Sequence, residues 1–290
     1  MRRWVIALVA CSLMVLSSCT SSGDAGPTSP VGGPSSPVEG DPPAGITLTF
    51  IQTRSLEGSN RAQVRVTNET SQALDVRKVG LDWPGFPGGT QSFPYLVEPG
   101  LTLDLPYDLP EPDCAASAGR APAYVLATTA QLSLRQPMPA DGMRFLSRLW
   151  RTACAAQEVA RVVAVRYGDT WTRRGRGEDS VLAGRLILTR GPEPDPVEVT
   201  SVKGSVLFAL SLPGAAHLPA GADRVSLPLE VRRGRCDEHG RSQSTQTFVW
   251  RVWLRLGDRE PVSQIVPLTT RQQVRMQGFL DLACAGHVKG

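Results

Sequence analysis

The stretch that indicates the fold class is residues 248–256, which read Phe-Val-Trp-Arg-Val-Trp-Leu-Arg-Leu. From Trp250 onward, every second residue is apolar, which is the period of a β-strand with one face on a core and one in water. Trp250 and Trp253 differ in parity, so they should point to opposite faces of that strand. We therefore expect one of the two to be exposed or to lie at an interface, unless a bulge intervenes.

Shorter stretches with the same alternation occur at residues 46–50, 64–66 and 101–105. Breaks rich in Pro and Gly separate the runs, such as residues 83–89, Trp-Pro-Gly-Phe-Pro-Gly-Gly. Short strands with frequent turn signals are typical of β-sandwiches. The sequence predicts a mainly all-β protein of two tandem immunoglobulin-like sandwich domains, each with one short helix and one disulfide.

A tandem repeat supports the division into two domains. Thr67 corresponds to Thr189 and Cys114 to Cys236, both at an offset of 122 residues. Cys154 corresponds to Cys284 at an offset of 130, as a loop insertion of 8 residues would produce. We expect the first domain at residues 46–157 and the second at residues 158–290.

One helix in each repeat is predicted from apolar residues at helical spacing. The first run includes Met143, Leu146 and Leu149, with Asp141 as its expected N-cap. The second begins at Thr270, the expected cap. Both helices are expected to end at the second Cys of their repeat, so that each helix is pinned to a loop near the first Cys.

The N-terminus carries the features of an export signal. Arg2 and Arg3 precede an apolar run over residues 4–16, which is shorter than the roughly 20 residues that span a bilayer. The run ends in Leu16-Ser17-Ser18-Cys19, which resembles the lipobox of bacterial lipoproteins. The resemblance implies a signal peptide at residues 1–18 and a Cys19 thiol that carries diacylglycerol, whose fatty acids include palmitate. The alternative is an ordinary signal peptide with an incidental Cys.

Residues 19–45 comprise this Cys and a stretch dominated by Pro, Gly and Ser. Such a composition cannot bury enough apolar surface to order the chain, so we expect a disordered tether. As a flexible coil it would reach roughly 30 Å. Together with the paired Cys repeats, these features resemble tandem-domain surface lipoproteins of GC-rich bacteria of the actinobacterial kind. The resemblance implies a lipid-anchored position at the extracytoplasmic face of the cell membrane and no particular activity.

Six Cys are present, of which Cys11 falls in the signal peptide and Cys19 in the lipobox. The other four allow three disulfide connectivities. The order of the repeats selects Cys114 with Cys154 and Cys236 with Cys284. A metal or redox role is the alternative, but the sequence contains no C-x-x-C motif.

Charge gives little indication of a partner. Lys and Arg total 31 against 27 Asp and Glu, which does not favour a nucleic-acid partner. Most of the basic residues are Arg, as in proteins of GC-rich genomes. A basic patch for anionic lipids or wall polymers is nonetheless predicted; the alternative is a set of solvated loops. The predicted patch comprises Arg173, Arg174, Arg176, Arg232, Arg233 and Arg235.

The segment Cys236-Asp237-Glu238-His239 is the densest polar cluster. Cys236, Asp237 and His239 form a candidate metal site. His217 and His287 do not have ligand spacing to His239. The alternative is a disulfide followed by a polar turn.

Other catalytic patterns are missing from the sequence. It contains no G-x-S-x-G motif, and Gly88-Gly89 does not belong to a nucleotide-binding pattern. Glu178 and Asp179 are adjacent, and in a loop of arginines we expect them to be solvated and neutralised. No cofactor and no catalytic residue is predicted.

Two functions therefore remain as hypotheses. The first is a non-catalytic binding or structural module, displayed at the cell envelope to a protein or polysaccharide partner. The second is a metal-handling protein or enzyme that uses the Cys236–His239 segment.

Overall fold

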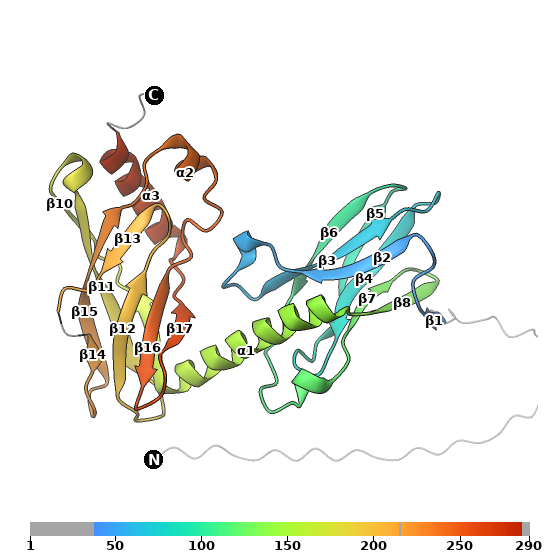
Figure 1. The fold of residues 1–290 in the computed structure, drawn as a ribbon, viewed down its shortest axis with the longest axis horizontal. Coiled ribbons are helices and arrows are strands. Elements are labelled where there is room, and N and C mark those ends of the chain that lie inside the picture. Colours follow the sequence, from blue (N-terminus) through green and yellow to red (C-terminus); the bar gives the residue numbers. More distant parts are fainter. Residues whose placement is uncertain (1–37, 215, 286–290) are drawn as a thin grey trace, which may run out of the picture. The chain divides into compact units, whose positions relative to one another are not determined.

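The computed structural model describes residues 38–214 and 216–285. Residues Pro37–Gly290 form one compact unit, in which two β-sandwiches follow one another along the chain and a long helix connects them (Figure 1). The predicted signal peptide, Cys19 and most of the predicted tether lie outside the described residues. None of the helices in the described part is both long and apolar enough to cross a bilayer.

The first sandwich contains a three-stranded sheet with the order β2-β3-β6 and a five-stranded sheet with the order β1-β8-β7-β4-β5. All neighbours are antiparallel except β1 and β8. The strands are β1 (Val38–Gly40), β2 (Ile46–Ile51), β3 (Arg61–Asn68), β4 (Leu74–Asp82), β5 (Gly89–Val97), β6 (Thr102–Asp108), β7 (Tyr124–Thr128) and β8 (Leu132–Pro137).

The second sandwich repeats this plan. One sheet has the order β10-β11-β15-β13, with β9 also paired to β11, and the other has the order β14-β12-β16-β17. The strands are β9 (Val163–Tyr167), β10 (Thr172–Arg174), β11 (Val181–Arg190), β12 (Val197–Lys203), β13 (Phe208–Ser211), β14 (His217–Leu218), β15 (Arg224–Arg233), β16 (Arg251–Leu256) and β17 (Val262–Ile265).

The two sandwiches share one strand order. The run β2-β3-β6 corresponds to β9-β11-β15, and β8-β7-β4-β5 corresponds to β17-β16-β12-β14. Two such antiparallel sheets form an immunoglobulin-like sandwich. The predicted all-β sandwich fold is confirmed, and the shared order agrees with the repeat seen in the sequence.

Each sandwich has its own apolar core, built from the alternating residues. In β16, Val252, Leu254 and Leu256 are buried, whereas the residues between them are partly exposed. Trp250 is buried in the second core and Trp253 lies on the other face, as their parity predicted. The first core draws its buried residues from Ile46–Leu146 and the second from Val159–Cys284.

Helix α1 (Ala140–Val162) departs from its prediction. Its N-cap is Pro139, so the prediction that Asp141 caps the helix is wrong, and Asp141 lies in the first turn. The helix does not end at Cys154 but continues to Val162, directly before β9. Leu146 packs in the first core, whereas Val159 and Val162 pack in the second. A helix of 23 residues is not the short one predicted, because its apolar residues serve both cores.

Helix α3 (Thr270–Cys284) ends at Cys284 as predicted. Its N-cap is Thr269 rather than Thr270, and Gln272 completes a capping box. A third, unpredicted helix, α2 (Glu238–Ser242), follows Cys236. Short 3-10 turns complete the fold: η1 (Arg54–Leu56), η2 (Ala118–Arg120) and η3 (Gly177–Asp179).

Candidate functional site

Both predicted disulfides are present. Cys114 in the loop after β6 bonds Cys154 on α1, with their Cα atoms 5.6 Å apart. Cys236 in the loop after β15 bonds Cys284 at the end of α3, with Cα atoms 5.4 Å apart. Cys236 and Cys284 are buried in the second core, whereas Cys114 is exposed. Each disulfide therefore pins a helix to the loop near the first Cys, as predicted.

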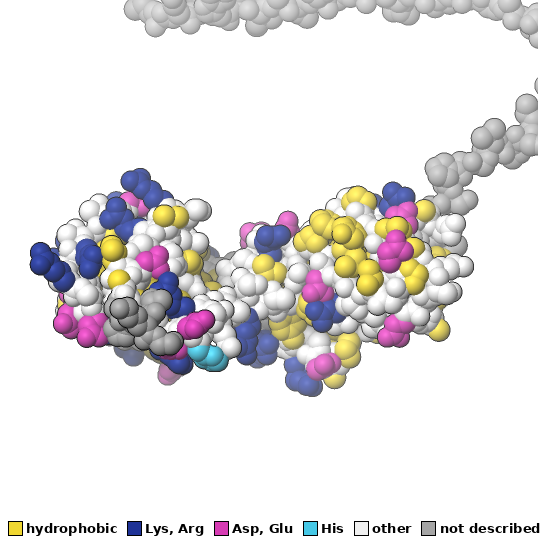
Figure 2. Space-filling view, turned by 90° about the horizontal axis from the view of Figure 1, so that it is seen from above, with side chains coloured by type: hydrophobic (Ala, Val, Ile, Leu, Met, Phe, Trp, Pro, Cys, Tyr) yellow, Lys and Arg dark blue, Asp and Glu magenta, His cyan; other side chains and the backbone are white. Residues whose placement is uncertain are grey.

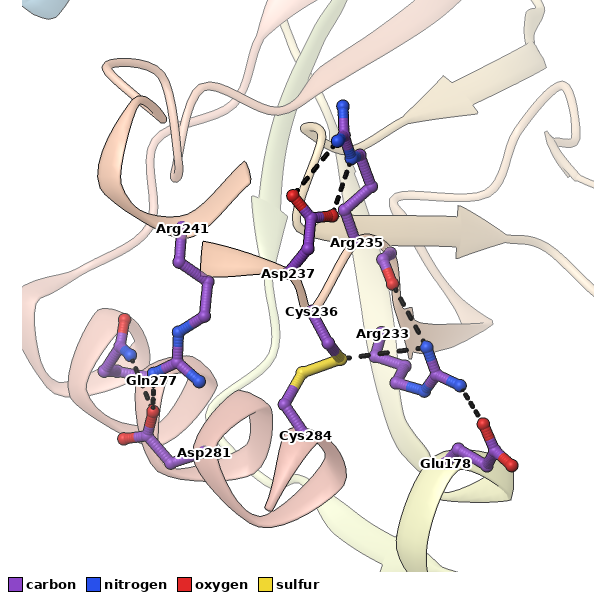
Figure 3. Close-up of a disulfide and its surroundings, with 10 residues drawn as sticks. Glu178, Arg233, Arg235, Cys236, Asp237, Arg241, Gln277, Asp281 and Cys284 are labelled. Atoms are coloured by element: carbon purple, nitrogen blue, oxygen red, sulfur yellow. Dashed lines mark hydrogen bonds and ion pairs between the residues drawn. A yellow bond between two sulfur atoms is a disulfide. The ribbon is translucent and has the colours of Figure 1, made fainter. Parts of the chain in front are cut away.

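The surroundings of Cys236 are polar and ordered by hydrogen bonds (Figure 3). Because the sulfur of Cys236 is bonded to Cys284, it offers no thiolate to a metal. Asp237 caps α2 by accepting a hydrogen bond from the Gly240 N–H at 2.9 Å, and His239 is exposed on that helix. Within residues 38–214 and 216–285, no group of three or more His, Cys, Asp or Glu side chains is arranged to hold a metal ion.

The carboxylate of Asp237 is held in its charged form by its neighbours. The Arg235 guanidinium donates two hydrogen bonds to it, at 2.9 and 3.0 Å. These bonds, and then the one from the Gly240 N–H, lower the pKa of Asp237 to about 2. The segment predicted as a candidate metal site therefore builds a helix cap next to a disulfide.

The six arginines of the predicted basic patch do not share one surface. Arg173 and Arg174 belong to β10 rather than to a loop, and Arg173 donates to the buried Ser180 hydroxyl at 3.1 Å. Arg233 pairs with Glu178 of η3, as Figure 3 shows, so the acidic pair contributes to neutralising this region. Arg232 lies 3.3 Å from Glu230, and Arg235 pairs with Asp237.

A cleft of about 830 Å³ lies within the compact unit and is lined by parts of both repeats. One wall is a face of α1, where Phe145, Leu149, Thr152 and Ala156 follow at helical spacing. The other walls come from the loop at residues 52–60, from residues 109–112 after β6 and from residues 263–265 of β17. Its volume is in the range of small-ligand sites.

The loop at residues 52–60 is fixed against β16 and β17. Glu57 accepts hydrogen bonds from Arg251 and from Gln246. Gly58 has φ of +83°, and a Cβ atom there would lie 2.7 Å from Cδ1 of Ile265. Glycine is therefore required both by the left-handed backbone and by the close approach.

Strand β17 contains two polar residues whose side-chain atoms are buried. The Ser263 hydroxyl and the Gln264 side-chain nitrogen are buried and have no hydrogen-bond partner among the described residues. Buried polar atoms of this kind are unusual and require an explanation. Both residues line the cleft, but neighbouring residues of a strand point to opposite faces, and the two unpartnered atoms are enclosed by protein rather than open to the cleft.

The backbone of β17 also has an open edge. The strand is the last of its sheet and pairs only with β16 among the described strands. The Val266 N–H donates to the Trp250 carbonyl at 3.1 Å, so Val266 and Trp250 form a hydrogen-bonded pair. In an antiparallel ladder such pairs alternate with pairs that exchange no hydrogen bond. Ile265 and Ser263 belong to the second kind, so their backbone N–H and C=O groups point away from β16. An extended segment could add to this edge as a further strand.

No motif in the sequence predicts this cleft. Its lining residues come from segments as distant as Gln52 and Ile265, and none of them belongs to a recognisable motif. The sequence Val-Ser-Gln-Ile of β17 has two polar residues in its middle. This departs from strict alternation, which an edge strand does not need, and it is the one sequence feature that agrees with an open edge here.

The chain matches no protein-family model, and it matches no curated protein. Among solved structures, red sea bream transglutaminase is 14% identical over 79% of this chain and 32% of that chain, with a TM-score of 0.23. The exo-chitosanase of Amycolatopsis orientalis is 12% identical over 77% of this chain and 26% of that chain, with a TM-score of 0.21. The chain spans about a third or less of these structures, and TM-scores this low carry no argument about its function.

Proposed function

We propose that the chain is an exported lipoprotein, anchored through Cys19 at the extracytoplasmic face of the bacterial cell membrane. The observation that carries this proposal is the pair of disulfides, one in each sandwich. Structural disulfides persist in oxidising compartments outside the cytoplasm, which is where the lipobox-like Leu16–Cys19 would deliver the chain.

We further propose that the protein acts there as a non-catalytic binding or structural module for an envelope partner. The cleft and the open edge of β17 support a binding role. Of the two partner classes expected, protein or polysaccharide, the strand edge favours an extended polypeptide segment. The alternative, metal handling or catalysis by the Cys236–His239 segment, would require the disulfide to Cys284 to be broken.

Labelling with an alkyne analogue of palmitate in the producing bacterium tests the anchor. The wild-type chain should incorporate the label and remain with the membrane fraction, and Cys19→Ser should lose the label. Cys11→Ser is the matched control, because Cys11 falls in the predicted signal peptide and should not carry the label. A wild-type chain that never incorporates the fatty acid would refute the anchor.

A photo-crosslinking amino acid placed in the cleft tests the binding role. Thr152 lines the cleft and is exposed, so a crosslinker there should reach a bound partner in intact cells. Gln131, exposed in the turn between β7 and β8, is the control position. The proposal expects a discrete covalent adduct from position 152 that position 131 does not give. Identical patterns from both positions would count against the cleft.

A further inference from the structure

The outer face of the sheet formed by β9, β10, β11, β13 and β15 carries an unusual set of arginines. Directly opposite residues of an antiparallel pair share one face of a sheet. Arg174 and Arg232 both lie opposite Val181, and Arg166 lies opposite Ile187. Arg185 and Thr189 continue the same face of β11, and Arg224 lies opposite Thr189. We name this set, Arg166, Arg174, Arg185, Arg224 and Arg232, the arginine face.

Burial confirms which side of the sheet faces solvent. Leu182 and Val231, opposite each other, are buried in the core, whereas all members of the arginine face are exposed. Val181 and Ile187 lie on the outer face but are only 8% and 7% exposed. The aliphatic stems of the flanking arginines lie beside them in register and can cover them, leaving the guanidinium groups in water.

The arginine face has an excess of positive charge. Arg232 pairs with Glu230 at 3.3 Å and Arg166 lies 3.8 Å from Asp169. Within the described residues, Arg174, Arg185 and Arg224 have no carboxylate within ion-pair distance. In Figure 2, several basic side chains, with acidic ones near them, lie at the left-hand end of the second sandwich, the side on which Figure 1 draws β10, β11 and β15.

The outer faces of the first sandwich are neutralised instead. On β3 and β6, Arg65 pairs with Asp104 at 2.7 Å and Arg61 with Asp108 at 3.8 Å. On the five-stranded sheet, Arg135 is 2.5 Å from Asp82. A genome-wide preference for Arg would enrich every face alike, so it does not account for an unpaired surplus on one sheet.

We propose that the arginine face docks on the anionic lipid headgroups of the membrane that holds the protein. This inference rests on the proposed function, because it identifies the membrane as the partner of a second surface. Arg174 and Arg232 are separated by two strand spacings, about 10 Å, and Arg224 lies about 27 Å farther along the sheet. A charge spread in two dimensions complements a planar anionic surface better than a linear polymer. A basic surface would add to the attachment that the proposed lipid anchor supplies.

Vesicle co-sedimentation tests the proposal with the Pro37–Gly290 fragment. This compact unit contains both cores and both disulfides, and it lacks the signal peptide and Cys19. A failure of the lipid anchor therefore leaves this test unaffected. The fragment should bind vesicles of phosphatidylglycerol with phosphatidylcholine at low salt, and not vesicles of phosphatidylcholine alone. Binding should fall steeply with added salt, because the arginines are exposed.

The variant Arg174→Gln/Arg185→Gln/Arg224→Gln removes the unpaired charges. Each basic residue near such a surface contributes roughly a fivefold factor, so the triple variant should bind about 100-fold more weakly. The matched control, Arg65→Gln/Arg135→Gln/Arg255→Gln, loses the same charge from arginines that pair with Asp104, Asp82 and Glu198. It should stay within about threefold of the wild type, and both variants should keep the wild-type circular dichroism melt.

Three results would overturn the proposal. The first is a wild-type fragment that does not bind the anionic vesicles. The second is an equal loss of binding in both triple variants, which would attribute binding to net charge alone. The third is tight, arginine-face-dependent binding of soluble polyphosphate without binding of vesicles, which would identify a linear polyanion as the occupant.

Discussion

The two sandwiches share their strand order but differ in how they use their surfaces and their disulfides. On the sheets of the first, the outward arginines pair with carboxylates, and Cys114 is exposed. In the second, an arginine surplus lies on one sheet and the disulfide is buried in the core. Inward residues alone must fit a packed interior, so the outward positions of a duplicated fold can diverge with little effect on stability.

Removal of either disulfide should lower the free energy of unfolding more than any other change considered below. Comparison of the two removals sharpens the contrast between the buried and the exposed disulfide. The two disulfides close loops of 40 and 48 residues, and in the chain-entropy model each should stabilise the folded protein by about 4 kcal/mol. Cys236→Ala/Cys284→Ala should cost about 1 kcal/mol more than Cys114→Ala/Cys154→Ala, because it also leaves a cavity in the core. Urea unfolding of both double variants measures the difference. Equal losses would mean that burial of the second disulfide adds nothing.

The second largest loss of unfolding free energy is expected from the buried Trp250, in contrast to Trp253 on the outer face. Trp250 packs edge-on against Tyr167 and Phe208, with ring centroids 5.4 Å apart in both pairs. Trp250→Ala should destabilise the protein by about 4 kcal/mol. Trp253→Ala, on the outer face of the same strand, should cost about 1 kcal/mol. Chemical denaturation followed by circular dichroism tests both, and a costlier Trp253→Ala would reverse the assignment of the two faces.

Because Asp237 caps α2 as a carboxylate, its contribution to stability should depend on pH only under acidic conditions. The pKa of Asp237 lies below that of an unfolded Asp, so its stabilising contribution is present above about pH 3.9 and is lost as the pH falls toward 2. In Arg235→Gln, the main cause of the shift is removed and the pKa should rise toward the ordinary value. Carboxyl carbon NMR titration of Asp237 follows this directly. An unchanged titration in Arg235→Gln would assign the shift to the Gly240 bond.

The smallest expected effect concerns the outer arginines. Arg65→Gln breaks two hydrogen bonds to Asp104 but, at an exposed site, should cost no more than about 0.5 kcal/mol. Arg185→Gln on the arginine face should leave the free energy of unfolding unchanged. Parallel urea titrations measure both. A clear loss in Arg185→Gln would give the arginine face a structural role.

Several features could be predicted from the residues because they depend on local pattern or order. Alternation of apolar residues indicated strands and separated Trp250 from Trp253, and the repeat selected both disulfides among three connectivities. The length of α1 was underestimated, because no signal in residues 154–162 shows that Val159 and Val162 enter the second core. The lipid anchor on Cys19 stays a prediction, since that residue lies outside the described part of the chain.

The sequence by itself determined the alternation, the repeat and the Cys order, since each of these is written along the chain. Tertiary structure decided the cleft and the arginine face. Arg166 and Arg224 are 58 residues apart in sequence, and only the register of β9, β11 and β15 places them on one surface. A slip of one residue in that register would turn every outward side chain inward, so such a surface exists only once the strands have paired.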